Sequence, residues 1–207
     1  MTTKIRIAVG YLACLVLMSG CATFQVAGEV QRGRYALRGN QPDIAAGHFS
    51  RAVELDPDFV LPGMLRENSH TYLGRAHYEA GNFAEARRSL EIAAKKTPHN
   101  GTARLYLGPA SLRQGIRDQG RKDAEAGLKE VSATLDAIAA GNTDAARYWD
   151  ASKRIRGEIQ NALALSSKLA ESDLISIGEW VGKNLDEEAE KAQADEIRDI
   201  QRRGRDN

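Results

Sequence analysis

Four histidines and two cysteines are the residues of this chain that could most readily bind a metal or act as nucleophiles. His70 and His77 are seven residues apart, so a helix would place both on one face, where they could share a metal ion. The alternative is that both rings pack in the interior. The sequence has no glycine-rich phosphate loop, no G-x-S-x-G motif and no H-E-x-x-H motif. We therefore expect a protein that is not an enzyme and uses no metal or cofactor.

The first 20 residues differ in composition from the rest of the chain. Lys4 and Arg6 form a short positive region, and residues 7–18 form an apolar run. A membrane-spanning helix needs about 20 apolar residues, so this run is too short to cross a bilayer. A positive region followed by a short apolar core is typical of a secretory signal peptide, and we expect residues 1–20 to be removed.

Two small residues and Cys21 follow the apolar core. Together they resemble a bacterial lipoprotein signal, which implies that Cys21 is the lipid attachment site and becomes the diacylated N-terminus. Ala22 stands where an aspartate often marks inner-membrane retention, so the resemblance favours the outer membrane, with the protein facing the periplasm. The alternatives are an ordinary secretory signal and an uncleaved anchor. Cys14 would leave with the signal, so no thiol would remain for a disulfide, a zinc cluster or catalysis.

The balance of charges argues against a nucleic-acid partner. The sequence has 29 basic and 28 acidic residues, and loss of Lys4 and Arg6 with the signal would leave 27 basic residues against 28 acidic ones. Domains that bind nucleic acids usually carry a clear basic excess on one face. Acidic and basic residues are mixed along this chain, which is typical of solvated helix faces.

The stretch from His70 to Pro98 contains two helical patterns, each with apolar residues spaced three and four apart. Gly81 and Asn82 separate the patterns, because both residues tolerate the left-handed backbone that ends a helix. Pro98 ends the second pattern, since proline has no N–H for the helical ladder. We therefore expect a helical hairpin with two buried stripes. They consist of Leu73, Ala76, His77 and Ala80 in the first helix and of Phe83, Ala86, Leu90 and Ala93 in the second.

Parts of this hairpin recur along the chain at nearly fixed spacing. Downstream, the pair Leu73-Gly74 returns 34 residues later as Leu107-Gly108. Upstream, residues of the second helix have counterparts at a spacing of 41. The seven residues beyond the period of 34 make about two helical turns, so they lengthen a helix without rotating its buried face. A repeated hairpin predicts an array in which each unit covers the next. The upstream residues are Ala45, Phe49, Ala52 and Pro57.

The pattern resembles the tetratricopeptide repeat, whose units carry Trp-x2-Leu-Gly-x2-Tyr, then Ala-x3-Phe, then Pro. His70 and His77 stand at the Trp and Tyr positions of the second unit, which favours packing over metal binding for these two residues. The resemblance implies an all-α fold with about three hairpins over residues 21–133. In the third unit, Ala124 and Leu128 fit the pattern only if about four residues are inserted.

Beyond the repeats the chain keeps helical patterns but loses the period. One apolar stripe runs along residues 128–138. A second stripe runs from Trp149 to Leu169, on a long predicted helix that Thr143 could cap. A third, amphipathic segment covers residues 174–185. We expect residues 134–185 to cap the array. For residues 186–207 we expect a charged tail that is helical or disordered and exposed to solvent. The alternative is that this tail binds a partner. Pro109 predicts a kink in the third unit.

The family resemblance also implies a binding surface. In tetratricopeptide arrays the first helix of each hairpin lines a concave face, which by repeat position carries several arginines here. Arginine can hold a carboxylate through two hydrogen bonds, which favours an extended or acidic polypeptide as partner. The alternative is that the arginines are solvated, or pair with Glu79 or with C-terminal helices packed into the groove. The expected groove residues are Arg34, Arg38, Thr71, Arg75, Tyr78, Glu79 and Arg113, with Leu105 and Leu112 beside them.

These features predict a periplasmic lipoprotein, anchored in the outer membrane, that acts as a protein-interaction scaffold in envelope assembly or secretion. Its expected partners are other proteins or extended peptide segments, and the membrane through its lipid. The alternative is a solute-binding accessory subunit that hands a small ligand to a transporter. A close-packed groove favours the scaffold, whereas a closed cavity with apolar walls favours the solute-binding subunit.

Overall fold

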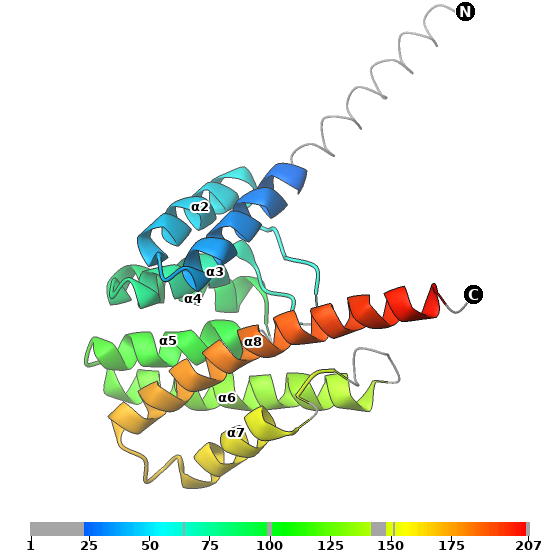
Figure 1. The fold of residues 1–207 in the computed structure, drawn as a ribbon. Coiled ribbons are helices and arrows are strands. Elements are labelled where there is room, and N and C mark those ends of the chain that lie inside the picture. The colour runs from blue at the N-terminus through cyan, green and yellow to red at the C-terminus, as the bar shows by residue number, and fades with distance from the viewer. Residues whose placement is uncertain (1–22, 64, 99–100, 142–147, 151, 206–207) are drawn as a thin grey trace, which may run out of the picture.

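The computed structural model describes residues 23–63, 65–98, 101–141, 148–150 and 152–205, and helices dominate it (Figure 1). The predicted all-α fold is therefore confirmed. Among these residues the single β-bridge joins Val60 to Asn68, in the connection between two helices. The predicted signal peptide and Cys21 lie outside the described residues. No helix within them is both long enough and apolar enough to cross a membrane.

The helices pair into successive hairpins, which stack along the molecule (Figure 1). Each of the first three pairs packs through its own apolar stripes, and neighbouring pairs contact each other. The array thus has the three predicted units, and two further helices follow it. The first hairpin joins residues 23–38 to α2 (Pro42–Leu55), the second joins α3 (Ser69–Glu79) to α4 (Phe83–Lys96), and the third joins α5 (Gly101–Arg113) to α6 (Arg117–Ala140). The two last helices are α7 (Arg154–Leu165) and α8 (Glu171–Arg203).

One glycine contact recurs in all three hairpins. A glycine of the first helix lies against the residue 16 positions later in the second helix, so closely that an added Cβ would come within 2.4 to 2.5 Å of it. The three pairs are Gly33 with Phe49, Gly74 with Leu90, and Gly108 with Ala124. Because the spacing is the same in the third pair, the insertion predicted for that unit is wrong.

Small residues explain why the third hairpin looked irregular in sequence. Gly120 and Ala124 occupy the places of Ala86 and Leu90, so α5 and α6 approach more closely than α3 and α4. A Cβ on Gly127 would lie 2.4 Å from the backbone nitrogen of Leu105. The register of the repeat is kept, and only the size of the residues at the contact changes.

The predicted stripes of the second hairpin are buried in part. Ala76, Ala86, Leu90 and Ala93 are fully buried, while Leu73, His77, Ala80 and Phe83 are only half-buried. Helix α3 instead buries much of the opposite side, including Arg75 and Tyr78. The physical reason is that α5 and α8 cover this side, which an array without α8 would leave to solvent.

The C-terminal helices differ from the predicted ones in length. Helix α7 begins only at Arg154, because Asp150 ends the preceding turn and its carboxylate accepts the free N–H groups of Ile155 at 3.0 Å and Arg156 at 3.2 Å. Thr143 lies outside the described residues. Helix α8 continues without a break from the expected capping segment into the expected tail, across residues 185 and 186. Helix α6 likewise continues across residues 133 and 134, where we expected the array to end. The first part of the predicted tail is therefore helical.

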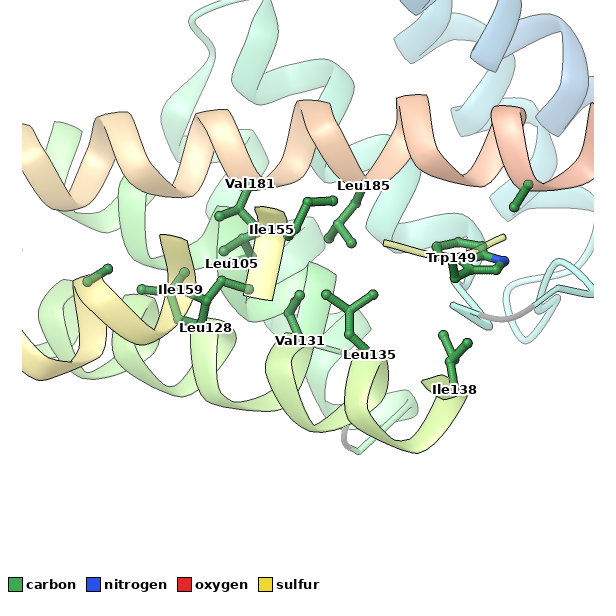
Figure 2. Packing of buried hydrophobic residues seen from close by; sticks show 12 residues of the cluster. Leu105, Leu128, Val131, Leu135, Ile138, Trp149, Ile155, Ile159, Val181 and Leu185 are labelled. Atoms are coloured by element: carbon green, nitrogen blue, oxygen red, sulfur yellow. The ribbon is translucent and has the colours of Figure 1, made fainter. Parts of the chain in front are cut away.

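A single apolar cluster joins α8 to the end of the array (Figure 2). Its members come from α5, α6, α7 and α8 and from Trp149, which lies between α6 and α7 in the chain. Burial of these side chains stabilises the attachment of α8 by about 1.5–3 kcal/mol for each large residue, before the entropy cost of ordering. The labelled members include Leu105, Leu128, Val131, Leu135, Ile138, Ile155, Ile159, Val181 and Leu185.

Pro109 lies inside α5, and the helix continues past it to Arg113. Proline cannot donate to the carbonyl of Leu105, four residues earlier. Gly178 of α8 packs at this place: a Cβ there would lie 3.0 Å from the Pro109 ring and 3.2 Å from the Leu105 oxygen. The proline thus forms part of the seat of α8, and glycine at residue 178 lets the two helices approach.

Candidate functional site

Helix α8 packs on α5, the first helix of the third hairpin (Figure 1), and it contacts the first helices of the other two hairpins through side chains, on the side where the concave face was expected. Each hairpin contributes one arginine to an acidic residue of α8. The acidic partners are spaced seven and four apart, so they lie on one face of α8. We call these three contacts the arginine ladder: Arg38 with Glu190 at 2.5 Å, Arg75 with Asp186, and Arg113 with Glu179 at 3.0 Å.

The ladder decides between two alternatives for the predicted groove arginines. Arg38, Arg75 and Arg113 pair with α8, as expected if C-terminal helices pack into the groove, and none of them pairs with Glu79 among the described residues. The acids of α8 were missed in the sequence because nothing in the repeat pattern assigns α8 to this face. Their seven-and-four spacing was visible, but it identifies a helix face and not the surface that the face contacts.

Arg75 is the central contact of the ladder. Its side chain is only 4% exposed, its Nη1 donates to Asp186 at 3.0 Å, and its Nη2 contacts the second carboxylate oxygen. The guanidinium carbon lies 5.0 Å from the centre of the Tyr106 ring, a cation–π arrangement. Asp186 is the main group that raises the pKa of Arg75, against the opposing effect of burial. Arg75 therefore stays charged over the physiological range.

A buried carboxyl group lies behind this pair. Glu67 is 4% exposed, and its Oε1 lies 3.9 Å from Nη1 of Arg75 without a hydrogen-bond partner among the described residues. Burial raises the pKa of Glu67, and the attraction of Arg75 offsets this only in part. Burial likewise raises the pKa of the neighbouring Tyr72. The protonation of Glu67 thus depends on its burial and on Arg75.

A second polar cluster joins α3 and α5 to α8. The hydroxyl of Tyr78 donates to Glu179, which also accepts from Arg113 at 3.0 Å. Burial, with the bond to Glu179 second, raises the pKa of Tyr78. The rings of Phe83 and Tyr106 flank Tyr78 edge-on, with centroids 5.4 and 5.7 Å away. These aromatic rings give this wall an apolar surface beside its charged groups.

Between the array and α8 remains a cavity of about 770 Å³, which we call the concave cavity. Its walls come from residues 23–38, α3, α5 and α8, and it is partly open to solvent. Six of the seven groove residues predicted from sequence line it: Arg34, Arg38, Arg75, Tyr78, Glu79 and Arg113. The arrangement therefore brings residues from all three hairpins to one binding-sized space.

The remaining predicted residues lie elsewhere. Thr71 is buried at the start of α3, where its N–H and hydroxyl both donate to Asn68, at 2.9 and 3.2 Å. Leu105 belongs to the apolar cluster under α8, and Leu112 packs against Gly120. Asn68 also holds the carbonyl of Ala93, so this polar contact ties α3 to α4 and has a structural role.

Four charged residues of the concave cavity remain outside the ladder. Arg34 and Lys183 are cationic, and Glu79 and Glu187 are anionic. Within the described part of the chain none of the four forms an ion pair or a side-chain hydrogen bond. Enclosure by the cavity walls raises the pKa of Glu79. The cavity wall therefore carries charges of both signs, of which Arg34 also attracts Glu67 and Glu79 is attracted by Arg75.

A second cavity of about 380 Å³ adjoins the first. The two share Arg34, Tyr72 and Asp186, and the second continues along α8 toward Trp149 and Gln193. Arg34 thus lies at the partition between two spaces and is available to both.

His70 and His77, the two histidines that could have shared a metal ion, lie in packed positions on α3. His70 is buried at the start of α3, and burial lowers its pKa. His77 is half-buried, and burial lowers its pKa as well. Over residues 23–205, apart from the stretches that are not described, no three His, Cys, Asp or Glu side chains are placed to hold a metal ion. Both rings fit the packing alternative.

Comparison with known proteins agrees with the geometry of the hairpins. Residues 73–137 match the family described as tetratricopeptide repeat, a segment that runs from α3 to the last turns of α6. A comparison with curated protein sequences found no match. Tetratricopeptide repeats are interaction modules for other proteins and peptides, typically without catalysis. With its repeated hairpins and the matched segment, the chain contains tetratricopeptide repeats.

Proposed function

We propose that this protein is a lipid-anchored adaptor of the bacterial cell envelope, which docks an extended segment of a partner protein in the concave cavity. The observation that carries this proposal is the convergence of Arg34, Glu79 and Arg113, from three different hairpins, on one cavity with aromatic walls. Repeat arrays use such combined surfaces to recognise polypeptides.

The dimensions favour an extended segment over a helix. A helix of 10 Å diameter fills about 400 Å³ per turn, so the cavity of about 770 Å³ has room for less than two turns. Helix α8 already occupies the rest of the groove, and its buried residues Val181 and Leu185 tie it to the core. An extended chain can instead pass between α3 and α8 with its backbone against polar side chains.

The location is proposed from the sequence. The positive region, short apolar core and Cys21 support a lipidated N-terminus, and Ala22 supports the outer membrane, with the array facing the periplasm. Envelope assembly and secretion are the processes in which an anchored adaptor of this kind would serve.

The cavity itself favours a second candidate function, a solute-binding accessory subunit of a transporter. Its volume falls in the range of about 300–1,000 Å³ that is typical of small-molecule sites. Its walls are strongly charged, unlike the apolar walls expected for such a subunit, and for this reason we place it second.

Crosslinking pull-downs from intact envelopes test the adaptor function. In the variant Arg34→Ala/Arg113→Ala, one cavity cation outside the ladder and one exposed ladder cation are lost while Arg75 is kept. We expect unchanged folding and loss of the captured partner. The control Lys129→Ala changes an exposed lysine of α6 outside the cavity. Capture that survives in the double variant would contradict docking in the cavity. A small molecule retained by the purified protein in native mass spectrometry, without a protein partner, would favour the solute-binding subunit.

A further inference from the structure

The first helix of the array, residues 23–38, and helix α8 run past each other in opposite directions. Arg38 pairs with Glu190 at 2.5 Å, and further along both helices Gln31 and Gln193 line the same second cavity. The numbering thus rises along α8 while it falls along the first helix. The start of the first helix and the end of α8 therefore extend beyond the second cavity on the same side, and in Figure 1 the red end of α8 reaches past the other labelled helices.

These two helix ends carry exposed apolar side chains. Phe24 is 84% exposed, Ile197 48% and Ile200 63%. Phe24 is seven residues from Gln31, and the two isoleucines are four and seven residues from Gln193. Such spacings keep each of them on the helix face that lines the second cavity further in. Beyond the cavity these two faces are open to solvent, so they form an apolar surface that lacks a cover.

The end of α8 is also strongly basic. Residues 197–205 hold four arginines and one acidic residue, Asp199, whereas the whole chain is nearly balanced, with 29 basic and 28 acidic residues. Two of the four arginines pair with acids one turn earlier on α8, at 2.8 and 3.8 Å. The other two, Arg202 and Arg205, form no ion pair or side-chain hydrogen bond with any residue that the structure describes. Exposed isoleucines beside such arginines are typical of helices that lie in a membrane surface.

We infer that this surface contacts the headgroups and the adjoining acyl region of an anionic phospholipid membrane, a conclusion that rests on the lipid anchor of the proposed function. We call the surface the basic tip, and it consists of Phe24, Ile197, Ile200, Arg202 and Arg205. Cys21 is three residues before Phe24, and three residues span at most about 11 Å. Acyl chains on Cys21 therefore bring the basic tip to the bilayer.

Charge favours a membrane over a second copy of this chain as the cover of the basic tip. In a symmetric dimer through this face, the arginines of one copy would lie against those of the other and repel them. Anionic lipid phosphates instead attract each arginine near the surface, while the isoleucines and Phe24 leave water for the acyl region. The membrane thus satisfies both the charge and the apolar side chains of the basic tip.

The second contact gives the array a fixed orientation. Acyl chains on Cys21 alone form a single attachment point, about which the array can turn. The end of α8 adds a contact that is tied to the third hairpin through the apolar cluster. The concave cavity lies further from the basic tip than the second cavity does, so the membrane contact leaves it accessible to a partner. Two isoleucines and two arginines are too few to hold the protein on the membrane without the acyl chains.

Quenching by brominated lipids tests the contact on the lipidated protein purified from membranes. A tryptophan is introduced by Ile200→Trp in the basic tip, or by Leu165→Trp at the end of α7, where the leucine is 50% exposed. The vesicles contain phosphatidylethanolamine and phosphatidylglycerol, both brominated in the acyl chains, and the signal of the native tryptophans is subtracted. We expect strong quenching of the tryptophan at residue 200 and none at residue 165.

A charge variant tests the preference for anionic lipid. Arg202→Gln/Arg205→Gln, combined with Ile200→Trp, should lower the ratio of bound to free tip about fivefold for each arginine, and so should reduce the quenching. Vesicles of phosphatidylcholine alone should reduce it as well. Lys95→Gln/Lys129→Gln, which changes two exposed lysines of α4 and α6, is the matched control and should keep the full quenching. Melting curves verify that each variant is folded.

The anchor and the basic tip can fail separately. Flotation of the wild-type protein with the vesicles reports the anchor, and quenching at residue 200 reports the tip. Flotation without quenching at residue 200 would refute the tip contact and leave the anchor intact, and a dimer in sedimentation would then assign this face to a second copy. Quenching that is unchanged in the arginine variant would refute recognition of anionic lipid. A protein that does not float would refute both.

Discussion

The guanidinium of Arg75 on α3 and the carboxylate of Asp186 on α8 form a two-point ion pair between residues 111 positions apart in the chain. The arginine is buried and the aspartate side chain is 37% exposed, so the pair lies at the border between core and cavity. It fixes α8 against the middle hairpin, where the concave face would otherwise be open.

Removal of Arg75 should destabilise the protein far more than removal of Arg113. Arg75→Ala leaves Asp186 and Glu67 without their cation, and we expect the free energy of unfolding to fall by about 2–3 kcal/mol. Breaking a fully buried pair costs about 3–5 kcal/mol, and the loss should be smaller here because Asp186 is partly solvated. Arg113 is exposed, so Arg113→Ala should cost less than about 1 kcal/mol. Denaturant unfolding measures both. Equal losses would show that α8 does not depend on the Arg75 contact.

The glycine contact of the second hairpin predicts a clear packing defect. In Gly74→Leu the new side chain would begin 2.5 Å from Cγ of Leu90, and the strain should cost about 1–3 kcal/mol. Gly157→Leu on α7 is the matched control, because an added Cβ meets nothing within 4 Å there. Both changes gain the same helix propensity, so the difference between their melting curves reports the contact.

A compensating change sharpens this test. Gly74→Ala combined with Leu90→Ala should lose less stability than the sum of the two single losses, because the smaller partner makes room for the methyl group. If the two single losses simply add, then Gly74 and Leu90 do not touch and the hairpin is assigned wrongly.

Glu67 predicts a dependence of stability on pH. Burial raises its pKa in the folded protein above the ordinary 4.5, so between these two values the folded state binds a proton that the unfolded state lacks. Its contribution to stability therefore increases as the pH falls. As the pH is lowered from about 7 to about 5, the melting temperature of the wild type should rise relative to that of Glu67→Gln. Glu158→Gln, at an exposed site on α7, should show no such difference. A relative loss on acidification would mean that Arg75 outweighs burial.

The anchor is tested independently of the fold. Cys21→Ser should abolish incorporation of a clickable fatty acid and release the protein from membranes, because stable attachment depends on the acyl chains. Cys14→Ser should keep the label, since that residue would leave with the signal. A label that persists after Cys21→Ser would exclude this cysteine as the attachment site.

The hairpins could be predicted from sequence because their contacts are local and repeated. Gly74 and Leu90 are 16 residues apart within one unit, and the period carries the same contact to Gly33 and Gly108. The groove arginines could also be predicted, because they stand at corresponding positions of the three repeats. The third unit was predicted wrongly because Gly120 and Ala124 replace larger residues while the register of the repeat stays the same. A search for a pattern of residue types interprets such a replacement as an insertion.

The position of α8 could not be predicted because it depends on contacts across most of the chain. Asp186 and Glu190 look like residues of a solvated charged tail until Arg75 and Arg38 are seen beside them. The late start of the long predicted helix, at Arg154, had a similar cause. Asp150 caps α7 from four residues before its start, which apolar periodicity does not reveal.

Photo-crosslinking from inside the cavity tests the central claim most directly. A photoreactive benzoylphenylalanine is placed at residue 79, which lines the cavity, or at residue 158, which is exposed on α7, and intact cells are irradiated. The account predicts a discrete crosslink to a peptide segment of another protein from residue 79 and none from residue 158. Crosslinks of equal yield from both positions, or from residue 158 alone, would contradict docking in the concave cavity.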